Sequence, residues 1–215
     1  MIISRGRSYI FVHIPKTGGT SLALALEERA MKDDIMLGDT PKAVKRRRRV
    51  KDIKTSGRLW KHAGLSDIDG LVDAHEIAEM FTFTLVRNPW DRLVSYYHWL
   101  KEQTFDHPAV HLAKAQSFEG FLADPITLTT QRQWPAASYM RDVNGVERCT
   151  SYIRLEHFEQ DSAALIAHLG FDLVMPWENR SHRTTGYRDY YSTAMRDAVA
   201  ESCTEDILRF GYTFS

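Results

Sequence analysis

Six consecutive residues near the start of the chain combine one lysine, two glycines and three hydroxyl side chains. Glycines let the main chain approach a ligand closely, while an ammonium group and hydroxyls bind the oxygens of an anion. We therefore predict a phosphate-binding turn in which the lysine supplies a mobile positive charge. Its predicted contacts are Lys16, Thr17, Gly18, Gly19, Thr20 and Ser21.

This turn stands between a predicted strand and a predicted helix. Residues 9–14 are β-branched, aromatic and aliphatic, which is typical of a buried strand. Residues 22–31 are rich in Ala, Leu and Glu, which favour a helix. The free amides and the dipole at the amino end of a helix attract an anion. The simpler alternative is a tight turn with Ser or Thr caps and no ligand.

The order of lysine and glycines argues against one kind of nucleotide site. The magnesium-nucleotide loop G-x-x-x-x-G-K-[ST] carries its lysine after the glycines, whereas Lys16 precedes Gly18 and Gly19. A magnesium-dependent nucleoside triphosphate site of that type is therefore disfavoured.

A second strand, turn and helix follow further along the chain. Residues 81–86 read Phe-Thr-Phe-Thr-Leu-Val, which predicts a strand that helices cover on both faces. Asn88 is a good N-cap residue and Pro89 a good first helical residue, so a helix is predicted to begin there.

Arg87 and Ser95 form the predicted second anion site. Arg87 ends the strand, and Ser95 lies on the following helix. A guanidinium group beside a helix amino end suits phosphate. In the alternative interpretation, Arg87 only pairs with Asp91.

A strongly basic run occupies residues 42–51, with seven positive charges in ten residues. Such a run forms either a solvated surface or a patch for an anionic acceptor or an outer phosphate of a cofactor. No aromatic residues interleave with the charges, so nucleic acid is the weaker option.

Composition sets the limits on protein class. The 215 residues are 43% hydrophobic and 26% charged, as in ordinary soluble proteins. Lys+Arg and Asp+Glu number 28 each, so no overall charge directs the chain to nucleic acid or membranes. No stretch approaches the roughly 20 apolar residues that a membrane span needs. Cys149 and Cys203 are too few for a disulfide framework, and we predict an unprocessed cytoplasmic protein.

Strands alternate with helices along the chain, which predicts an α/β fold with a parallel sheet. Further predicted elements are a strand at residues 150–156 and helices at 160–169 and 193–210. No internal repeat or linker is found, so residues 1–215 are predicted to form one domain.

The two predicted phosphate sites together resemble the carbohydrate-type sulfotransferases, which use 3′-phosphoadenosine 5′-phosphosulfate (PAPS). His-Ile-Pro-Lys-Thr-Gly-Gly-Thr-Ser at residues 13–21 is similar to the 5′-phosphosulfate loop of that family. Val-Arg-Asn-Pro-Trp-Asp-Arg-Leu-Val-Ser-Tyr-Tyr at residues 86–97 is similar to its 3′-phosphate motif. Weaker similarity continues through residues 154–158, 179–181, 187–191 and 205–212.

The resemblance implies a P-loop-like, three-layer fold with a central, mostly parallel sheet flanked by helices. It also implies in-line transfer of a sulfuryl group from PAPS to a hydroxyl or amine of an acceptor, with carbohydrate as one acceptor class and no metal. Lys16 then stabilises the leaving phosphate, and Arg87 and Ser95 match the 3′-phosphate binders of the family.

The general base is the next implied role. His62 is the first candidate because the family often has a histidine shortly before the second phosphate strand. His75 and Glu76 are the fallback candidates, and His13 is expected to be structural. Arg154, Arg180 and Arg183 are candidates to close over PAPS or to hold an anionic acceptor.

The chain departs from the eukaryotic members of that family, which usually carry a membrane anchor and disulfides. It resembles a compact, bacterial, cytoplasmic form. Two other function classes stay open at this point: a nucleotide kinase or phosphotransferase, and a non-catalytic nucleotide- or polyanion-binding module that uses residues 42–51. We expect no nucleic acid partner. The sequence leaves the acceptor and the oligomeric state open.

Overall fold

The structure is a computed structural model that describes residues 1–176 and 185–215. The chain forms two compact units. The first consists of Met1–Val86 and Ala136–Asn179, and the second of Arg87–Pro135 and Arg180–Ser215. The expectation of a single domain over residues 1–215 stays a prediction beside this division.

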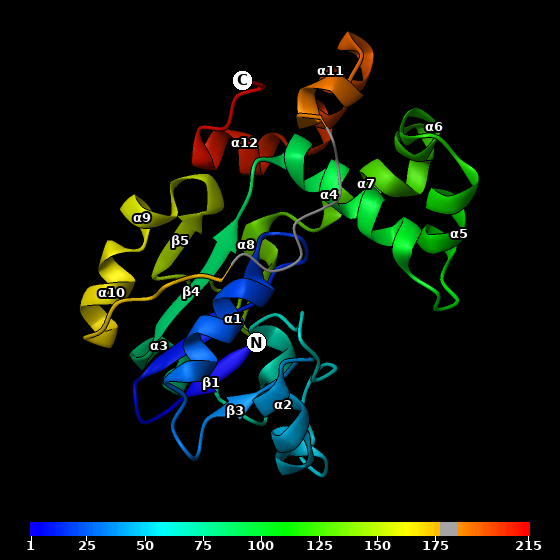
Figure 1. Ribbon diagram of the computed structural model, residues 1–215. Helices are drawn as coiled ribbons and strands as arrows, with labels where there is room; N and C mark the ends of the chain where they lie inside the picture. The colour runs from blue at the N-terminus through cyan, green and yellow to red at the C-terminus, as the bar shows by residue number, and fades with distance from the viewer. Residues whose placement is uncertain (177–184) are drawn as a thin grey trace. The chain divides into compact units, whose positions relative to one another are not determined.

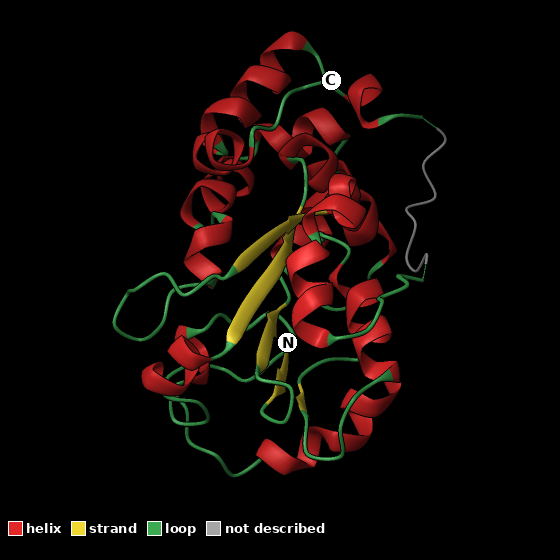
Figure 2. Cartoon of the chain, turned by 90° about the vertical axis from the view of Figure 1, so that its left-hand side faces the viewer, coloured by secondary structure: helices red, strands yellow, loops and turns green. Residues whose placement is uncertain are grey.

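The first unit contains a five-stranded sheet of order β3-β1-β2-β4-β5. β4 is parallel to both of its neighbours, β2 and β5, and β1 is antiparallel to both β2 and β3. Four of the five strands therefore run in the same direction, as the yellow arrows of Figure 2 show for the central ones. The strands are β1 (Ile2–Ser4), β2 (Tyr9–Val12), β3 (Ile35–Met36), β4 (Phe81–Val86) and β5 (Ser151–Arg154).

This sheet confirms the predicted mixed α/β fold with a central, mostly parallel sheet flanked by helices. Side chains alternate across it, because successive residues of a strand point to opposite faces. Phe11 and Phe83 pack with α1 (Gly19–Glu28) and α10 (Ala163–Leu169) on one face. Ile10 and Val12 pack on the other face with the segment that precedes β4. In Figure 1, α1 crosses the strands of the first face.

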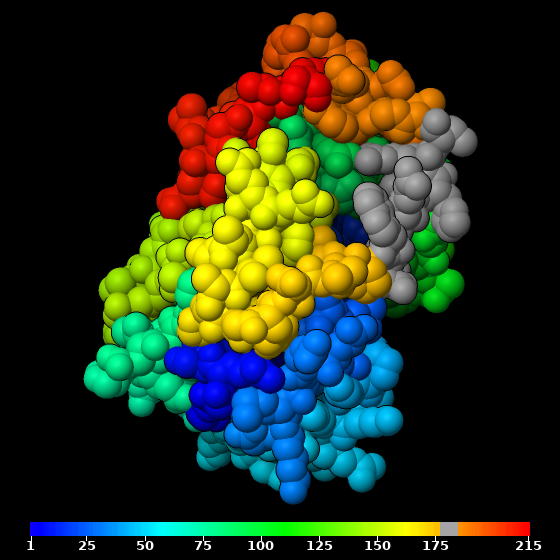
Figure 3. Space-filling model, turned by 60° about the vertical axis from the view of Figure 1, so that its left-hand side comes forward, coloured from blue at the N-terminus to red at the C-terminus, as the bar shows by residue number. Residues whose placement is uncertain are grey.

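The β1–β2 turn packs against the helices that follow β5. His168 Nε2 lies 2.9 Å from the carbonyl oxygen of Arg7, and the Arg7 guanidinium stacks over the ring of Phe171. Figure 3 shows α9 (Phe158–Asp161) and α10 in yellow against this dark-blue turn. These contacts close the edge of the sheet at which the parallel strands begin.

The second unit is helical and has an aromatic core of its own. α4 (Pro89–Glu102) contributes Trp90, Leu93 and Tyr97, which pack with Phe118 and Phe121. Asn88 caps this helix and Pro89 is its first residue, which confirms the predicted beginning.

The remaining helices depart from prediction at two places. The predicted helix 193–210 is two helices, α11 (Thr193–Ser202) and α12 (Thr204–Phe210), because Cys203 between them leaves helical geometry, with φ −109 and ψ 22. The predicted helix 160–169 is likewise divided into α9 and α10. The short strands β1 and β3 were not predicted.

The other elements are short. They are α2 (Pro41–Arg46), η1 (Arg47–Val50), η2 (Ser66–Ile68), α3 (Ala74–Glu79), α5 (Pro108–Ala115), α6 (Phe118–Ala123), α7 (Pro125–Gln133), α8 (Ala136–Tyr139), η3 (Leu155–His157) and η4 (Tyr187–Tyr190). Within the described ranges, no helix has the length and apolar composition needed to cross a bilayer.

Candidate functional site

The glycine turn connects the carboxyl end of β2 to the first residue of α1. Gly18 is the N-cap, in the left-handed region at φ 86, and no side chain caps the helix. The first amides of a helix have no intrahelical partner and need an acceptor from elsewhere. A helix that begins on glycine without a side-chain cap is therefore suited to bind an anion.

The two glycines are required by their surroundings. A Cβ on Gly18 would lie 2.8 Å from Leu155 Cδ1, and one on Gly19 would lie 2.1 Å from His13 Cδ2. The second clash is with the ring of His13, which is 6% exposed. Alanine at Gly19 would therefore displace His13 or the turn.

Lys16 and Thr17 have different parts in this turn. Lys16 has φ 66, which is uncommon for a residue with a side chain and is found where function requires it. Thr17 is 1% exposed, and its hydroxyl donates to the carbonyl oxygen of Ile14 at 2.9 Å. The Thr17 hydroxyl thus braces the turn, which leaves the backbone amide as its contact for a phosphate. Ser21 is buried and Thr20 is half-buried at the start of α1.

The structure brings His62 to this turn from a distant part of the chain. His62 Nδ1 lies 2.7 Å from the carbonyl oxygen of His13, and the two imidazole rings are 4.7 Å apart. A carbonyl oxygen only accepts, so Nδ1 carries the proton and Nε2 keeps its lone pair. This tautomer is the one that a general base requires if Nε2 faces the substrate.

Burial keeps both histidines neutral. It lowers the pKa of His62 to about 4, although the hydrogen bond to the His13 carbonyl acts in the opposite direction. Burial also lowers the pKa of His13 well below its usual value, with smaller contributions from nearby positive groups. His13 is thus a buried, neutral ring packed on the turn, as expected for a structural residue.

Several hydrogen bonds hold the segment around His62. The carbonyl oxygen of Lys61 accepts from the amino group of Met1 at 2.9 Å. The amide of Gly64 donates to Asp67 Oδ2 at 2.8 Å, and the amide of Leu65 donates to the carbonyl oxygen of Tyr139 at 2.9 Å. Residues on both sides of His62 are therefore fixed in position.

A hollow of about 210 Å³ lies beside the turn. His13 and Thr20 line it together with Lys61 and with apolar residues of α1 and of the β3–α2 connection. Lys61 Nζ forms an ion pair with Asp39 Oδ2 at 2.5 Å. The sequence analysis did not identify Lys61 or Asp39 as site residues. Lys61 could have been identified as the neighbour of His62, whereas no sequence motif lies near Asp39.

The fallback bases lie at the wrong edge of the sheet. His75 and Glu76 belong to α3, which directly precedes the amino end of β4. The glycine turn follows the carboxyl end of β2, which is parallel to β4. Glu76 instead pairs with Arg5 at 2.5 Å. The structure therefore separates both residues from the turn.

The predicted second anion site belongs to the second unit. Arg87 Nε and Nη2 donate to Asp91 Oδ2 at 2.9 and 2.7 Å, so the alternative pairing is present. Ser95 is 5% exposed, and within the described residues its hydroxyl makes no hydrogen bond. Asn88 Oδ1 caps the helix by accepting from the amide of Trp90 at 3.2 Å. A meeting of these residues with Lys16 stays a prediction.

Of the other three candidate arginines, the structure describes the contacts of Arg154 alone. Arg154 donates through Nε and Nη2 to the two carboxylate oxygens of Asp161, at 2.7 and 2.9 Å, and this pairing lowers the pKa of Asp161. Arg180 and Arg183 lie outside the described residues. Across the described ranges, no cluster of three or more His, Cys, Asp or Glu side chains could hold a metal ion.

Comparison with known proteins identifies the family. A family model described as "Sulfotransferase family" matches residues 1–213. The chain is similar in structure to mouse sulfotransferase SULT7A1 complexed with PAP, with a TM-score of 0.55 and 16% sequence identity over 94% of this chain and 84% of that chain. That likeness supports the fold, and no curated protein matches the sequence.

The family match disfavours the kinase alternative and the non-catalytic alternative. It spans both compact units and includes the glycine turn, His62 and the Arg87 segment. The chain belongs to the sulfotransferase family.

Proposed function

We propose that the protein transfers the sulfuryl group of PAPS to a hydroxyl or amine of an acceptor. One observation carries the proposal: a helix without a side-chain cap begins on Gly18 and Gly19 beside two neutral histidines, of which His62 has its Nε2 lone pair available. Sulfuryl transfer needs a site that binds the phosphate of the donor and a base that takes the proton of the acceptor. PAP, which the matched mouse sulfotransferase holds, is the product that PAPS leaves behind.

The glycine turn would hold the 5′-phosphate. The amides at the start of α1 and the Lys16 ammonium group would contact its oxygens. During transfer the acceptor oxygen attacks sulfur, and the bond from sulfur to the bridging oxygen of the 5′-phosphate breaks. The electron pair of that bond moves to the phosphate, where Lys16 stabilises the added charge.

His62 would take the proton of the acceptor at Nε2. In the free protein, burial lowers the pKa of His62 to about 4, which makes it a weak base. A bound phosphosulfate brings negative charge near the ring, and negative charge favours the protonated imidazole. We therefore expect donor binding to raise the pKa of His62 toward the pH at which the enzyme works.

Arg87 and Ser95 would hold the 3′-phosphate. Arg87 is already oriented by Asp91, and the Ser95 hydroxyl has no partner within the described residues. An arginine left without its phosphate penalises donors that lack this group. This contact would let the enzyme distinguish PAPS from adenylyl sulfate.

The acceptor would enter by the hollow of about 210 Å³ beside Thr20 and His13. Carbohydrate as the acceptor class, a bacterial cytoplasmic setting and independence from metal ions belong to the proposal as predictions. Neither Cys149 nor Cys203 forms a disulfide bond, which agrees with the proposed reducing compartment.

Thermal stabilisation by nucleotides tests the donor. We expect 3′-phosphoadenosine 5′-phosphate to raise the melting temperature without magnesium, and AMP and ATP to have much smaller effects. Incubation with labelled PAPS and a panel of sugars, alcohols and amines should then give a labelled product. A preference for ATP with magnesium would contradict the proposal and favour a phosphotransferase.

A further inference from the structure

Positive charge is concentrated in one stretch of the chain. Residues 42–60 contain nine Lys or Arg and a single Asp, which gives them a net charge of +8. The whole chain has a formal net charge of zero, so the remaining residues together carry −8. The neutral balance of the chain therefore conceals a strongly basic region, which attracts an anionic surface at short range.

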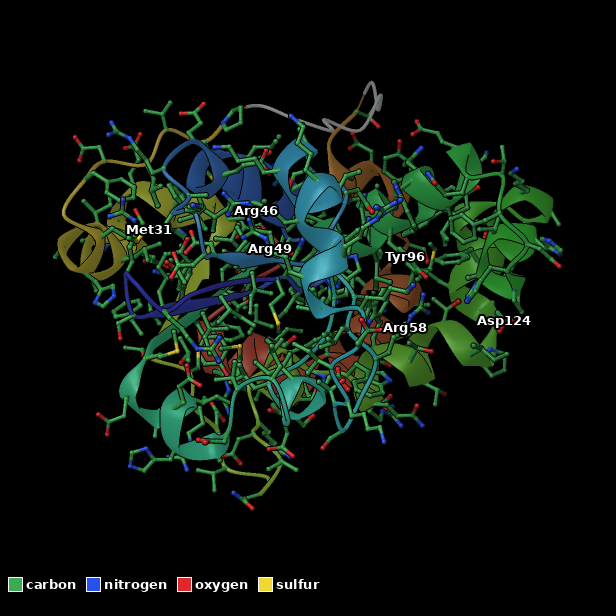
Figure 4. All side chains as sticks on the ribbon, turned by 90° about the horizontal axis from the view of Figure 1, so that it is seen from below. Met31, Arg46, Arg49, Arg58, Tyr96 and Asp124 are labelled. Carbon is green, nitrogen blue, oxygen red and sulfur yellow. The ribbon has the colours of Figure 1, made fainter. Side chains whose placement is uncertain are left out.

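Some of these cations bind the main chain of the protein itself. The first part of the basic region forms α2 and η1. Arg46 Nη1 donates to the carbonyl oxygen of Met31 at 2.8 Å, and Arg49 Nη1 donates to that of Lys32 at 2.6 Å. Figure 4 shows the two arginines side by side. Their contacts fasten α2 and η1 to the segment that follows α1.

Lys42 is docked in the same way, because its Nζ donates to the carbonyl oxygen of Glu27 at 2.5 Å. The other four cations of residues 42–51 are exposed, and within the described part of the chain their side chains make no hydrogen bond or ion pair. They are Lys45, Arg47, Arg48 and Lys51. Stabilisation of the fold therefore accounts for three of the seven charges and leaves four available to a ligand.

Three of the available cations surround one groove of about 500 Å³. The residues that line it are Arg47, Arg48, Val50, Lys51, Ile53, Thr55 and Leu59. The Thr55 hydroxyl donates to the carbonyl oxygen of Gly57 at 2.8 Å, so the donors left to a ligand among these side chains are the three cations. Cations beside hydrocarbon side chains match the phosphate and the hydrocarbon of a phospholipid.

Exposed apolar side chains accompany these cations. Ile53 and Trp60 are 37% and 42% exposed. Trp60 follows Leu59, which lines the groove, and the Arg58 guanidinium stacks over the Trp60 ring at 5.5 Å. Indole rings are enriched where the hydrocarbon of a bilayer meets its headgroups. Basic and apolar side chains on one surface are typical of segments that lie in this interface.

We propose that the groove and its rim dock the protein on a membrane that contains anionic phospholipids. The phosphate of one lipid lies between Arg47, Arg48 and Lys51, while Ile53 and Trp60 insert between the headgroups. Clusters of four to eight Lys or Arg bind such leaflets through charge complementarity. The apolar floor of the groove favours a bilayer over a soluble polyanion, which has no hydrocarbon to bury. Docking of this kind needs no spanning helix and is independent of sulfuryl transfer.

Two matched triple variants test the electrostatic part of the proposal. The groove variant carries Arg47→Ala, Arg48→Ala and Lys51→Ala. The control variant replaces three exposed cations outside residues 42–60 and loses the same net charge. Its changes are Lys101→Ala, Lys114→Ala and Arg141→Ala. Binding is measured by co-sedimentation with vesicles of phosphatidylcholine alone and of equal parts phosphatidylcholine and phosphatidylglycerol.

We expect the wild type to bind the vesicles that contain phosphatidylglycerol and not those of phosphatidylcholine alone. The groove variant should bind about 100-fold more weakly, because each Lys or Arg near an anionic leaflet contributes severalfold. The control variant should bind within about threefold of the wild type. Added salt should weaken binding of the wild type, since it screens the attraction.

Tryptophan fluorescence tests the insertion. Vesicles that contain brominated lipid quench an indole ring that reaches the hydrocarbon. Quenching should fall sharply in Trp60→Phe and should persist in Trp134→Phe, whose replaced ring is 53% exposed and lies in the other unit. Melting curves show that each variant is folded. If the groove variant does not fold, this pair of tryptophan variants decides the proposal.

Four outcomes would overturn the proposal. They are no binding of the wild type to vesicles with phosphatidylglycerol, equal weakening in both triple variants, equal quenching in both tryptophan variants, and a loss in the groove variant that appears with sulfated dextran or an oligonucleotide but not with vesicles. The last outcome would assign the groove to a soluble polyanion.

Discussion

The two strand–turn–helix segments that were predicted to bind phosphate differ in what the first backbone amides of their helices can bind. α1 begins on Gly18 without a side-chain cap, whereas α4 begins on Asn88, whose Oδ1 accepts from the amides of Trp90 and Asp91. In the first segment the main-chain amides are available to a ligand. In the second, a side chain has already taken that place.

The charged residues of the two segments differ in the same sense. Lys16 lies in a left-handed turn at φ 66, and Arg87 is held by the carboxylate of Asp91. The comparison suggests a division of labour. In the proposed reaction, the first segment would bind the reacting phosphate through its main chain and Lys16, and the second would recognise the outer phosphate through the side chains of Arg87 and Ser95.

Replacement of Lys16 should give the largest effect. We expect Lys16→Ala to lower turnover by about 1000-fold, because the charge that develops on the leaving phosphate loses its partner. Binding of 3′-phosphoadenosine 5′-phosphate, measured by calorimetry, should change far less. Lys16→Gly tolerates φ 66 without strain and separates charge from folding. Wild-type turnover in either variant would remove Lys16 from catalysis.

Replacement of Arg87 should change recognition. Arg87→Ala is expected to weaken binding of 3′-phosphoadenosine 5′-phosphate by about 10- to 100-fold, since a charged hydrogen bond to phosphate is lost. Binding of AMP, which lacks the 3′-phosphate, should be unchanged. Arg132→Ala is the control, because Arg132 is an arginine of the same unit that pairs with Glu201 at 3.0 Å. An equal loss for AMP and the bisphosphate would show that Arg87 only supports the fold.

The buried His62 should appear in the pH dependence of stability. Its pKa of about 4 in the folded protein lies below the usual 6.5, so the unfolded chain binds a proton first as the pH falls. The free energy of unfolding should therefore decrease from pH 6.5 toward pH 4, by at most about 3 kcal/mol for this group.

Urea unfolding of the wild type and of His62→Asn between pH 7 and pH 4 measures this contribution. The variant should take up about one proton fewer on unfolding at pH 5. In the same variant, the acidic limb of the pH–rate profile should be lost. An unchanged pH dependence of both stability and rate would exclude His62 as the buried base.

Loss of the Asn88 cap should give the smallest effect. Asn88→Ala is expected to cost about 1 to 2 kcal/mol of stability, because the amides at the start of α4 lose their acceptor. Preference for the bisphosphate over AMP should be retained. Ser117→Ala, which removes the cap of α6, serves as the matched control. A collapse of this preference in Asn88→Ala alone would mean that the cap takes part in recognition.

Local sequence accounts for most of the elements that frame the site. Residues 81–86 form β4 as predicted, and α4 starts at Asn88 and Pro89, because strand propensity and capping act within a few residues. β1 and β3 escaped prediction, since three and two residues carry too little periodicity to be distinguished from turns. Cys203 leaves helical geometry and divides the last helix, and no residue pattern in the sequence predicted this division.

The sequence by itself determined the glycine turn, the order of its lysine and glycines, the Arg87 segment and the family to which they are similar. These features depend on residue type and spacing, which are local properties. Only the tertiary structure decided that His62 donates to the His13 carbonyl 49 residues away, and that His75 and Glu76 lie at the opposite edge of the sheet.

The basic run shows the same limit. Its charges are evident from the sequence, but long-range contacts divide them into Arg46 and Arg49, which bind main-chain carbonyls, and Arg47 and Arg48, which face a groove. Neighbours along the chain differ in this way because a helical turn points successive side chains in different directions. What each direction meets is set by elements far away in the sequence.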